Sequence, residues 1–165
     1  MYPDADIPVL QLSINAFKPL QYHIDLAARL AALREQGVMI VGSGNVVHNL
    51  KTLKWREANL AYDWAERFDE AATEQLANDP GDILRLTRHP DYDKAVPTPD
   101  HFIPLLYVAG LAAADNAQPE LLLDGHTMGS ISMSSYGVDA ALELRKYPGC
   151  AAVLPEGVPP EQSNM

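Results

Sequence analysis

Three things are scarce in this sequence: cysteine, positive charge and long apolar runs. The single cysteine, Cys150, excludes an internal disulfide framework and any metal site built from several thiolates. Lys and Arg number 12 against 22 Asp and Glu, which gives a formal net charge of -10 at pH 7. Nucleic acids and anionic membranes select clustered positive charge, so we expect neither of them as a partner.

Membrane-spanning and targeting segments are also missing from the pattern. The longest apolar stretch, residues 102–114, is interrupted by Pro104 and Gly110 and is too short to span a bilayer. Residues 1–6 lack the basic region and apolar core of a signal peptide. Together with the single cysteine, these features favour a reducing, cytoplasmic setting.

The composition that remains is that of a globular protein. Hydrophobic residues make up 47% of the chain and charged residues 21%, and 165 residues are enough for one domain with a core. From Lys146 onward, proline and glycine recur at short intervals: Pro148, Gly149, Pro155, Gly157, Pro159 and Pro160. We therefore predict a folded part over residues 1–140 and a disordered tail over residues 141–165.

The first third of the chain has the pattern of a strand, a helix and a second strand. Residues 8–14 and 38–41 are short apolar runs, as expected of buried strands. Between them, Pro19 begins a helical pattern with an apolar stripe, and Gly37 ends it. Such a unit places its two strands parallel. The sequence therefore predicts an α/β fold, a mostly parallel sheet with flanking helices.

Further elements follow along the chain. Helical spacing predicts helices over residues 62–77 and 81–87. Thr98 and Pro99 form a helix-start signature, so we expect a further helix from Thr98 to about residue 114. Residues 121–123 and 129–136 are predicted strands.

His48 is the first candidate for chemistry. It belongs to a loop, residues 42–50, that leaves the carboxyl end of the second predicted strand, where α/β sheets bind ligands. Gly42 and Gly44 let a ligand approach the backbone closely. A histidine between apolar neighbours stays neutral, which suits a proton acceptor or a metal ligand. The alternative is a buried histidine bonded to a backbone carbonyl, and the residues alone leave both interpretations open.

His101 and His126 are further candidates. At the first turn of its predicted helix, His101 faces the positive end of the helix dipole, which favours a neutral ring; simple packing on the sheet is the alternative. His126 lies in a turn and could line a pocket or face solvent. Two neutral histidines suggest a metal held by nitrogen, as in zinc hydrolases or non-haem iron oxygenases. Two ligands are too few, so the site is incomplete unless a carboxylate such as Asp124 joins it.

Four motifs carry a family resemblance. They are MYPDADIP (1–8), SGNVVHNL (43–50), TPDHFIPLLY (98–107) and MGSISMS (128–134). Together they resemble the class III extradiol ring-cleavage dioxygenases, most of all the 4,5-DOPA dioxygenase branch, over residues 1 to about 136. The resemblance implies an aromatic ring-opening enzyme that acts on a catechol such as DOPA with O2. It also implies a non-haem metal, Fe(II) for oxygen chemistry, with Zn(2+) often found in its place.

The resemblance also implies roles for individual residues. His48 matches the active-site histidine beside the metal, which can act as acid/base on the catechol or ligate the ion. His101 matches a metal-binding position. We further predict that Asn45, Asn49 and His126 line the substrate pocket.

The chain departs from the family in length. Members of the family are longer at the N-terminus, and that part carries two metal-binding histidines and a further active-site histidine. We therefore expect this chain to be the C-terminal portion of a larger single-domain fold, with weak metal binding by itself. A sheet that lacks its first strands would expose an apolar edge and favour self-association. The alternatives are a metal-dependent hydrolase and a non-catalytic remnant that needs a separate N-terminal half.

Overall fold

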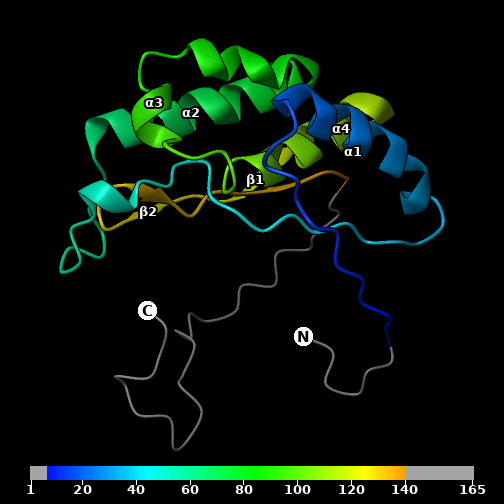
Figure 1. The fold of residues 1–165 in the computed structure, drawn as a ribbon, viewed down its shortest axis with the longest axis horizontal. Helices are drawn as coiled ribbons and strands as arrows, with labels where there is room; N and C mark the ends of the chain where they lie inside the picture. The colour runs from blue at the N-terminus through cyan, green and yellow to red at the C-terminus, as the bar shows by residue number, and fades with distance from the viewer. Residues whose placement is uncertain (1–6, 140–165) are drawn as a thin grey trace, which may run out of the picture.

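The computed structural model describes residues 7–139 (Figure 1). The predicted disordered tail, residues 141–165, and Cys150 lie outside the described residues. In chain order the elements are helix α1 (Leu20–Arg34), 3₁₀ helix η1 (Leu50–Thr52), α2 (Asp63–Asn78), 3₁₀ helix η2 (Pro80–Arg88), α3 (Tyr92–Ala95), α4 (Ile103–Asp115), and strands β1 (Glu120–Leu123), β2 (His126–Thr127), β3 (Ile131–Ser132) and β4 (Ser135–Gly137).

Helices and strands form two layers. Figure 1 shows the helices gathered on one side of the molecule and the strands with the extended segments on the other. Helix α4 is the central element, because most of its residues are buried. Around it, the core joins Phe68 and Leu76 of α2, Ile83 of η2 and Val47 of the His48 loop. The core therefore packs directly against the loop that carries the first candidate residue.

Helix α1 crosses α4 at very short range. Its buried hydrophobic residues, Ile24, Ala27 and Ala31, lie on one face, as the apolar stripe predicts. A Cβ atom on Gly110 of α4 would lie 2.5 Å from the backbone oxygen of Ile24 and 2.8 Å from the Cβ of Ala27. Only glycine allows the two backbones to approach this closely.

The predicted parallel sheet is wrong for the described residues. Both two-stranded sheets are antiparallel: β1 pairs with β4, and β2 pairs with β3. Residues 8–14 and 38–41 form no strand, and their apolar side chains reach solvent, with Leu10 95% and Met39 79% exposed. An apolar run shows that a segment favours burial, but a strand also needs a neighbouring strand to accept its hydrogen bonds. Within residues 7–139, no strand lies beside either of these two segments.

The remaining predictions are confirmed in part. Helix 62–77 is confirmed as α2 and strand 121–123 as β1, whereas residues 81–87 form a 3₁₀ helix. The predicted strand 129–136 is divided into β3 and β4. Between them, Met133 donates its backbone N–H to Gly125, and Ser134 donates its hydroxyl to Asp69. No helix of residues 7–139 is long and apolar enough to cross a membrane.

Helix α4 begins later than predicted. It starts at Ile103, and residues 99–102 form a turn in which Phe102 and Ile103 donate their backbone N–H groups to the carbonyl of Pro99. His101 therefore lies just before the helix and not in its first turn.

Candidate functional site

Backbone contacts bring the His48 loop against the segment that leads into α4. The N–H of Asn45 donates to the carbonyl of His101 over 3.1 Å. A Cβ atom on Gly44 would lie 2.3 Å from that same carbonyl oxygen, so the approach requires glycine. The glycine that suggested a ligand loop in the sequence thus serves a contact between two parts of the chain.

His48 itself is held from two sides. Its backbone N–H donates to the carbonyl of Ala95 over 2.9 Å, and it forms an isolated antiparallel bridge with Ile131 of β3. The next residue, Asn49, is buried, and its amide group donates to Lys94 and accepts from Lys51. Both polar ends of Asn49 are therefore bonded to the backbone, which fixes the chain directly after His48.

The rings of His48 and His101 stack on one another. Their centroids are 3.5 Å apart and the planes differ by 8°. This pairing joins residues that lie far apart in the sequence, and both side chains are partly exposed. The two histidines that the sequence singled out therefore form one site.

Asn45 determines which ring nitrogen of His101 carries the proton and which keeps a lone pair for a metal ion. Its amide nitrogen donates to the carbonyl of Ser132 over 2.7 Å, which turns its oxygen toward Nδ1 of His101 at 3.2 Å. An amide oxygen only accepts, so the bond places the proton of the imidazole on Nδ1. A neutral His101 then keeps the lone pair on Nε2, and a metal-ligating histidine is commonly oriented by such a partner.

Burial and the neighbouring His101 ring both favour the neutral form of His48. Burial lowers the pKa of His48 below its usual value of 6.5, and the nearby His101 ring lowers this pKa further. The carboxylate of Asp100 opposes both effects. His48 is therefore neutral near pH 7 and able to accept a proton.

A cavity of about 270 Å³ lies beside His101. Asn45, Ser134, Ser135 and Tyr136 supply its other polar side chains, and the rest of its wall is apolar or glycine. His126 does not border this cavity. It lies at a separate pocket beside Asp69 and Asp124. The structure thus brings together His48, His101 and Asn45, with Asn49 next to them, and leaves His126 elsewhere.

Sequence reasoning missed Asp69. This residue of α2 is 3% exposed and lies on the buried face of the helix together with Phe68 and Ala72. The signal was a carboxylate within the apolar stripe, where an acid costs free energy unless it has a partner. Asp124, which the sequence suggested as a ligand beside the two stacked histidines, lies with Asp69 and His126 instead.

Comparison with known proteins gives the family. The family described as "Catalytic LigB subunit of aromatic ring-opening dioxygenase" matches residues 1–139. The chain belongs to this family. It is 45% identical over 140 residues to a 4,5-DOPA dioxygenase extradiol of Escherichia coli K12, and 36% identical over 138 residues to one of Beta vulgaris. These matches confirm the resemblance that the four motifs carry.

Each of these alignments covers 82% of this chain but 51% of the relative, so the chain spans about half the length of the curated relatives. Among solved structures, it resembles the crystal structure of an uncharacterized protein from Escherichia coli K12, at a TM-score of 0.74 and 42% identity. That match covers 82% of this chain and 57% of the other. The fold of this LigB-family chain is thus seen in a relative.

Enzymes of the LigB family depend on a non-haem metal. The two stacked histidines are suitable ligands for such a metal, but two ligands are too few to hold it. Neutral imidazole nitrogens are ligands that iron and zinc both accept. Within residues 7–139, however, no group of three possible ligands within reach of one ion includes His48 or His101. Two side chains are fewer than such sites use.

Proposed function

We propose that this chain carries part of the active site of an extradiol dioxygenase, which opens the ring of a catechol such as DOPA with O2. The observation that carries the proposal is the stacked pair of His48 and His101. The proposal is supported by membership of the LigB family and by relatives that are named 4,5-DOPA dioxygenase extradiol. The metal we propose is Fe(II), with Zn(2+) as an ion that the same nitrogens can hold.

His101 is the proposed metal ligand. The amide oxygen of Asn45 accepts a hydrogen bond from Nδ1–H, so Nε2 is the nitrogen that can bind an ion. When bound, the metal would bring catechol and oxygen together and favour ionisation of the catechol hydroxyl. We further propose that the remaining ligands come from residues that correspond to the half of the relatives that this chain does not span.

His48 is the proposed acid/base. Its lowered pKa keeps the ring neutral near pH 7, so the ring can accept a proton from a substrate hydroxyl and return it later. Stacking on His101 holds that ring beside the proposed metal ligand. If His48 instead ligates the ion, His48→Gln should lose iron.

The cavity beside His101 is the proposed substrate pocket. Asn45 lines it directly. Both ends of the Asn49 amide are bonded to the backbone, at Lys94 and Lys51, and His126 borders the other pocket. Roles for these two residues in substrate binding stay predictions, as does a cytoplasmic setting.

A chimera tests the proposed function. Residues 1–139 of this chain replace the aligned part of the Escherichia coli relative, and the product is loaded with Fe(II). We expect oxygen uptake and a yellow product on addition of L-DOPA. His89→Gln, outside the site, is the matched control for substitutions of His48 and His101. A folded, iron-loaded chimera that consumes no oxygen with any of several catechols contradicts the proposal, and the hydrolase and remnant alternatives then remain.

Self-association is a further proposal. Residues 8–14 and 38–41 expose apolar side chains, among them Val9 at 76% and Val41 at 65%. Extended apolar segments with free backbone groups are ready sites for pairing with another chain. We propose that two copies of this chain associate through these segments.

A further inference from the structure

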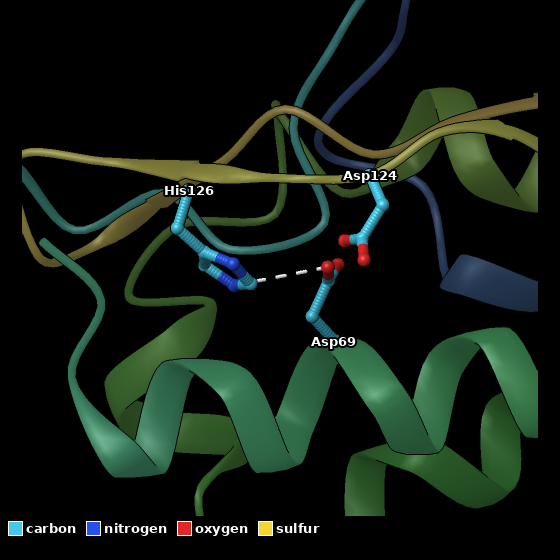
Figure 2. Close-up of side chains that lie close together, drawn as sticks. All are labelled: Asp69, Asp124 and His126. Atoms are coloured by element: carbon cyan, nitrogen blue, oxygen red, sulfur yellow. Dashed lines mark ion pairs between the residues drawn. The ribbon is translucent and has the colours of Figure 1, made fainter. Parts of the chain in front are cut away.

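Three side chains converge at a second place in the molecule, away from the stacked histidines. Figure 2 shows Asp69 of α2 facing Asp124, which lies between β1 and β2, and His126 of β2. One ligand atom from each lies within 4.8 Å of the other two. Nε2 of His126 is 3.7 Å from Oδ2 of Asp69. The cluster shares no lining residue with the cavity beside His101.

Buried polar atoms of this cluster lack partners. Among the described residues, Oδ1 of Asp69 and Nε2 of His126 accept or donate no hydrogen bond. The side chain of Asp69 is only 5% exposed and that of His126 11%, so bulk water hardly reaches them. Buried polar groups are nearly always satisfied, so an unpartnered carboxylate oxygen beside an unpartnered imidazole nitrogen indicates a missing ligand.

The charge around the cluster favours a cation. It opens on a cavity of about 300 Å³ whose titratable lining residues are His126 and the carboxylates Glu66, Asp69, Glu70, Glu74 and Asp124, with no Lys or Arg among them. Within the lining of this cavity, no cationic side chain therefore offsets the carboxylates.

We propose that Asp69, Asp124 and His126 bind a divalent transition-metal ion of the zinc class. One imidazole nitrogen and two carboxylate oxygens suit zinc, whereas calcium and magnesium prefer oxygen alone. Two aspartates balance the charge of the ion. Small side-chain rotations bring the three ligand atoms to the separations of a tetrahedral site, and a water molecule from the cavity completes it. The ion joins α2 to the connection between β1 and β2.

Zinc binding to the whole chain tests the proposal. The variant His48→Ala/His101→Ala removes the proposed catalytic site, so any zinc that it holds belongs elsewhere. We expect this variant to bind one zinc ion per chain by calorimetry and to melt on the order of 5 °C higher with excess zinc. A variant that binds no zinc overturns the proposal and leaves the proposed dioxygenase function untouched.

Ligand variants locate the ion. In the same background we expect Asp124→Asn, His126→Gln and Asp69→Asn each to lower zinc affinity at least about tenfold. Glu74→Gln is the matched control, because it removes an exposed carboxylate from the same cavity without touching the cluster. Asp124 is exposed, so its substitution decides the result even where Asp69→Asn does not fold. Affinities equal to that of Glu74→Gln overturn the assignment.

Discussion

Histidine occurs five times in this chain, and the surroundings of each ring determine what it can do. His48, in the loop of residues 42–50, stacks on His101, which lies just before α4. His126 lies among carboxylates. His23 is buried in α1 with Nδ1 3.4 Å from the hydroxyl of Tyr107. The same side chain thus serves as a proposed catalyst, a proposed ligand and a core residue.

His23 gives the fold a pH dependence. Burial lowers the pKa of His23 below 6.5, and a backbone hydrogen bond with Asn15 opposes this only in part. The unfolded chain therefore binds more protons just below pH 6.5 than the folded chain. Stability is retained above pH 6.5 and falls as the pH drops through the unfolded pKa toward the lowered folded pKa.

Urea unfolding at two pH values checks this expectation. Between pH 7.5 and 5.5, we expect the unfolding free energy of the wild type to fall by more than that of His23→Gln, which has no ring to protonate. Equal decreases in the two proteins contradict the assignment.

At the scale of elements, helices were more predictable than strands. Their caps, breaks and apolar stripes are local features, and α1 and α2 lie close to where the spacing places them. Strand pairing depends on partners that are distant in the sequence. Residues 8–14 and 38–41 have the composition of strands, yet no described strand runs beside them.

The candidate site, too, could be predicted only in part from the sequence. His48 and His101 could be named from loop position and motif. Their stacking, and the bond from Asn45 to His101 over 56 positions of sequence, depend on contacts between distant parts of the chain. The place of Asp69 in the apolar stripe marks it as unusual, but helical spacing alone does not show that Ser134 and His126 lie opposite it.

Helix crossing yields a prediction about Gly110. A methyl group there would meet the backbone of Ile24, which cannot give way as a flexible side chain could. We expect Gly110→Ala to lower the unfolding free energy by about 1–3 kcal/mol in urea titration. Gly81→Ala is the control: its nearest neighbour would be 3.4 Å away, and we expect a change within about 0.5 kcal/mol. Equal stabilities of the two variants contradict the close crossing.

At the scale of the whole molecule, the exposed apolar segments set the expected behaviour in solution. Leu10 and Met39 are among the most exposed large hydrophobic residues of the described chain. We expect sedimentation velocity to show a concentration-dependent dimer for the wild type. Leu10→Lys/Met39→Lys should shift the chain toward monomer, because buried charge opposes pairing.

Trp55→Lys is the control for that experiment, since Trp55 is 67% exposed and lies outside both segments. If the double variant dimerises as the wild type does, or if Trp55→Lys shifts the chain toward monomer equally, association through residues 8–14 and 38–41 is contradicted.

The division of labour between His48 and His101 is tested most directly by measuring iron content and oxygen uptake together in the chimera. We predict that His101→Gln loses both iron and oxygen uptake with L-DOPA. His48→Gln should keep its iron while uptake falls by about 10²–10⁴-fold, as expected for loss of an acid/base. Loss of iron in His48→Gln as well would make His48 a ligand. Full iron and undiminished uptake in both variants would contradict the assignment of the active site.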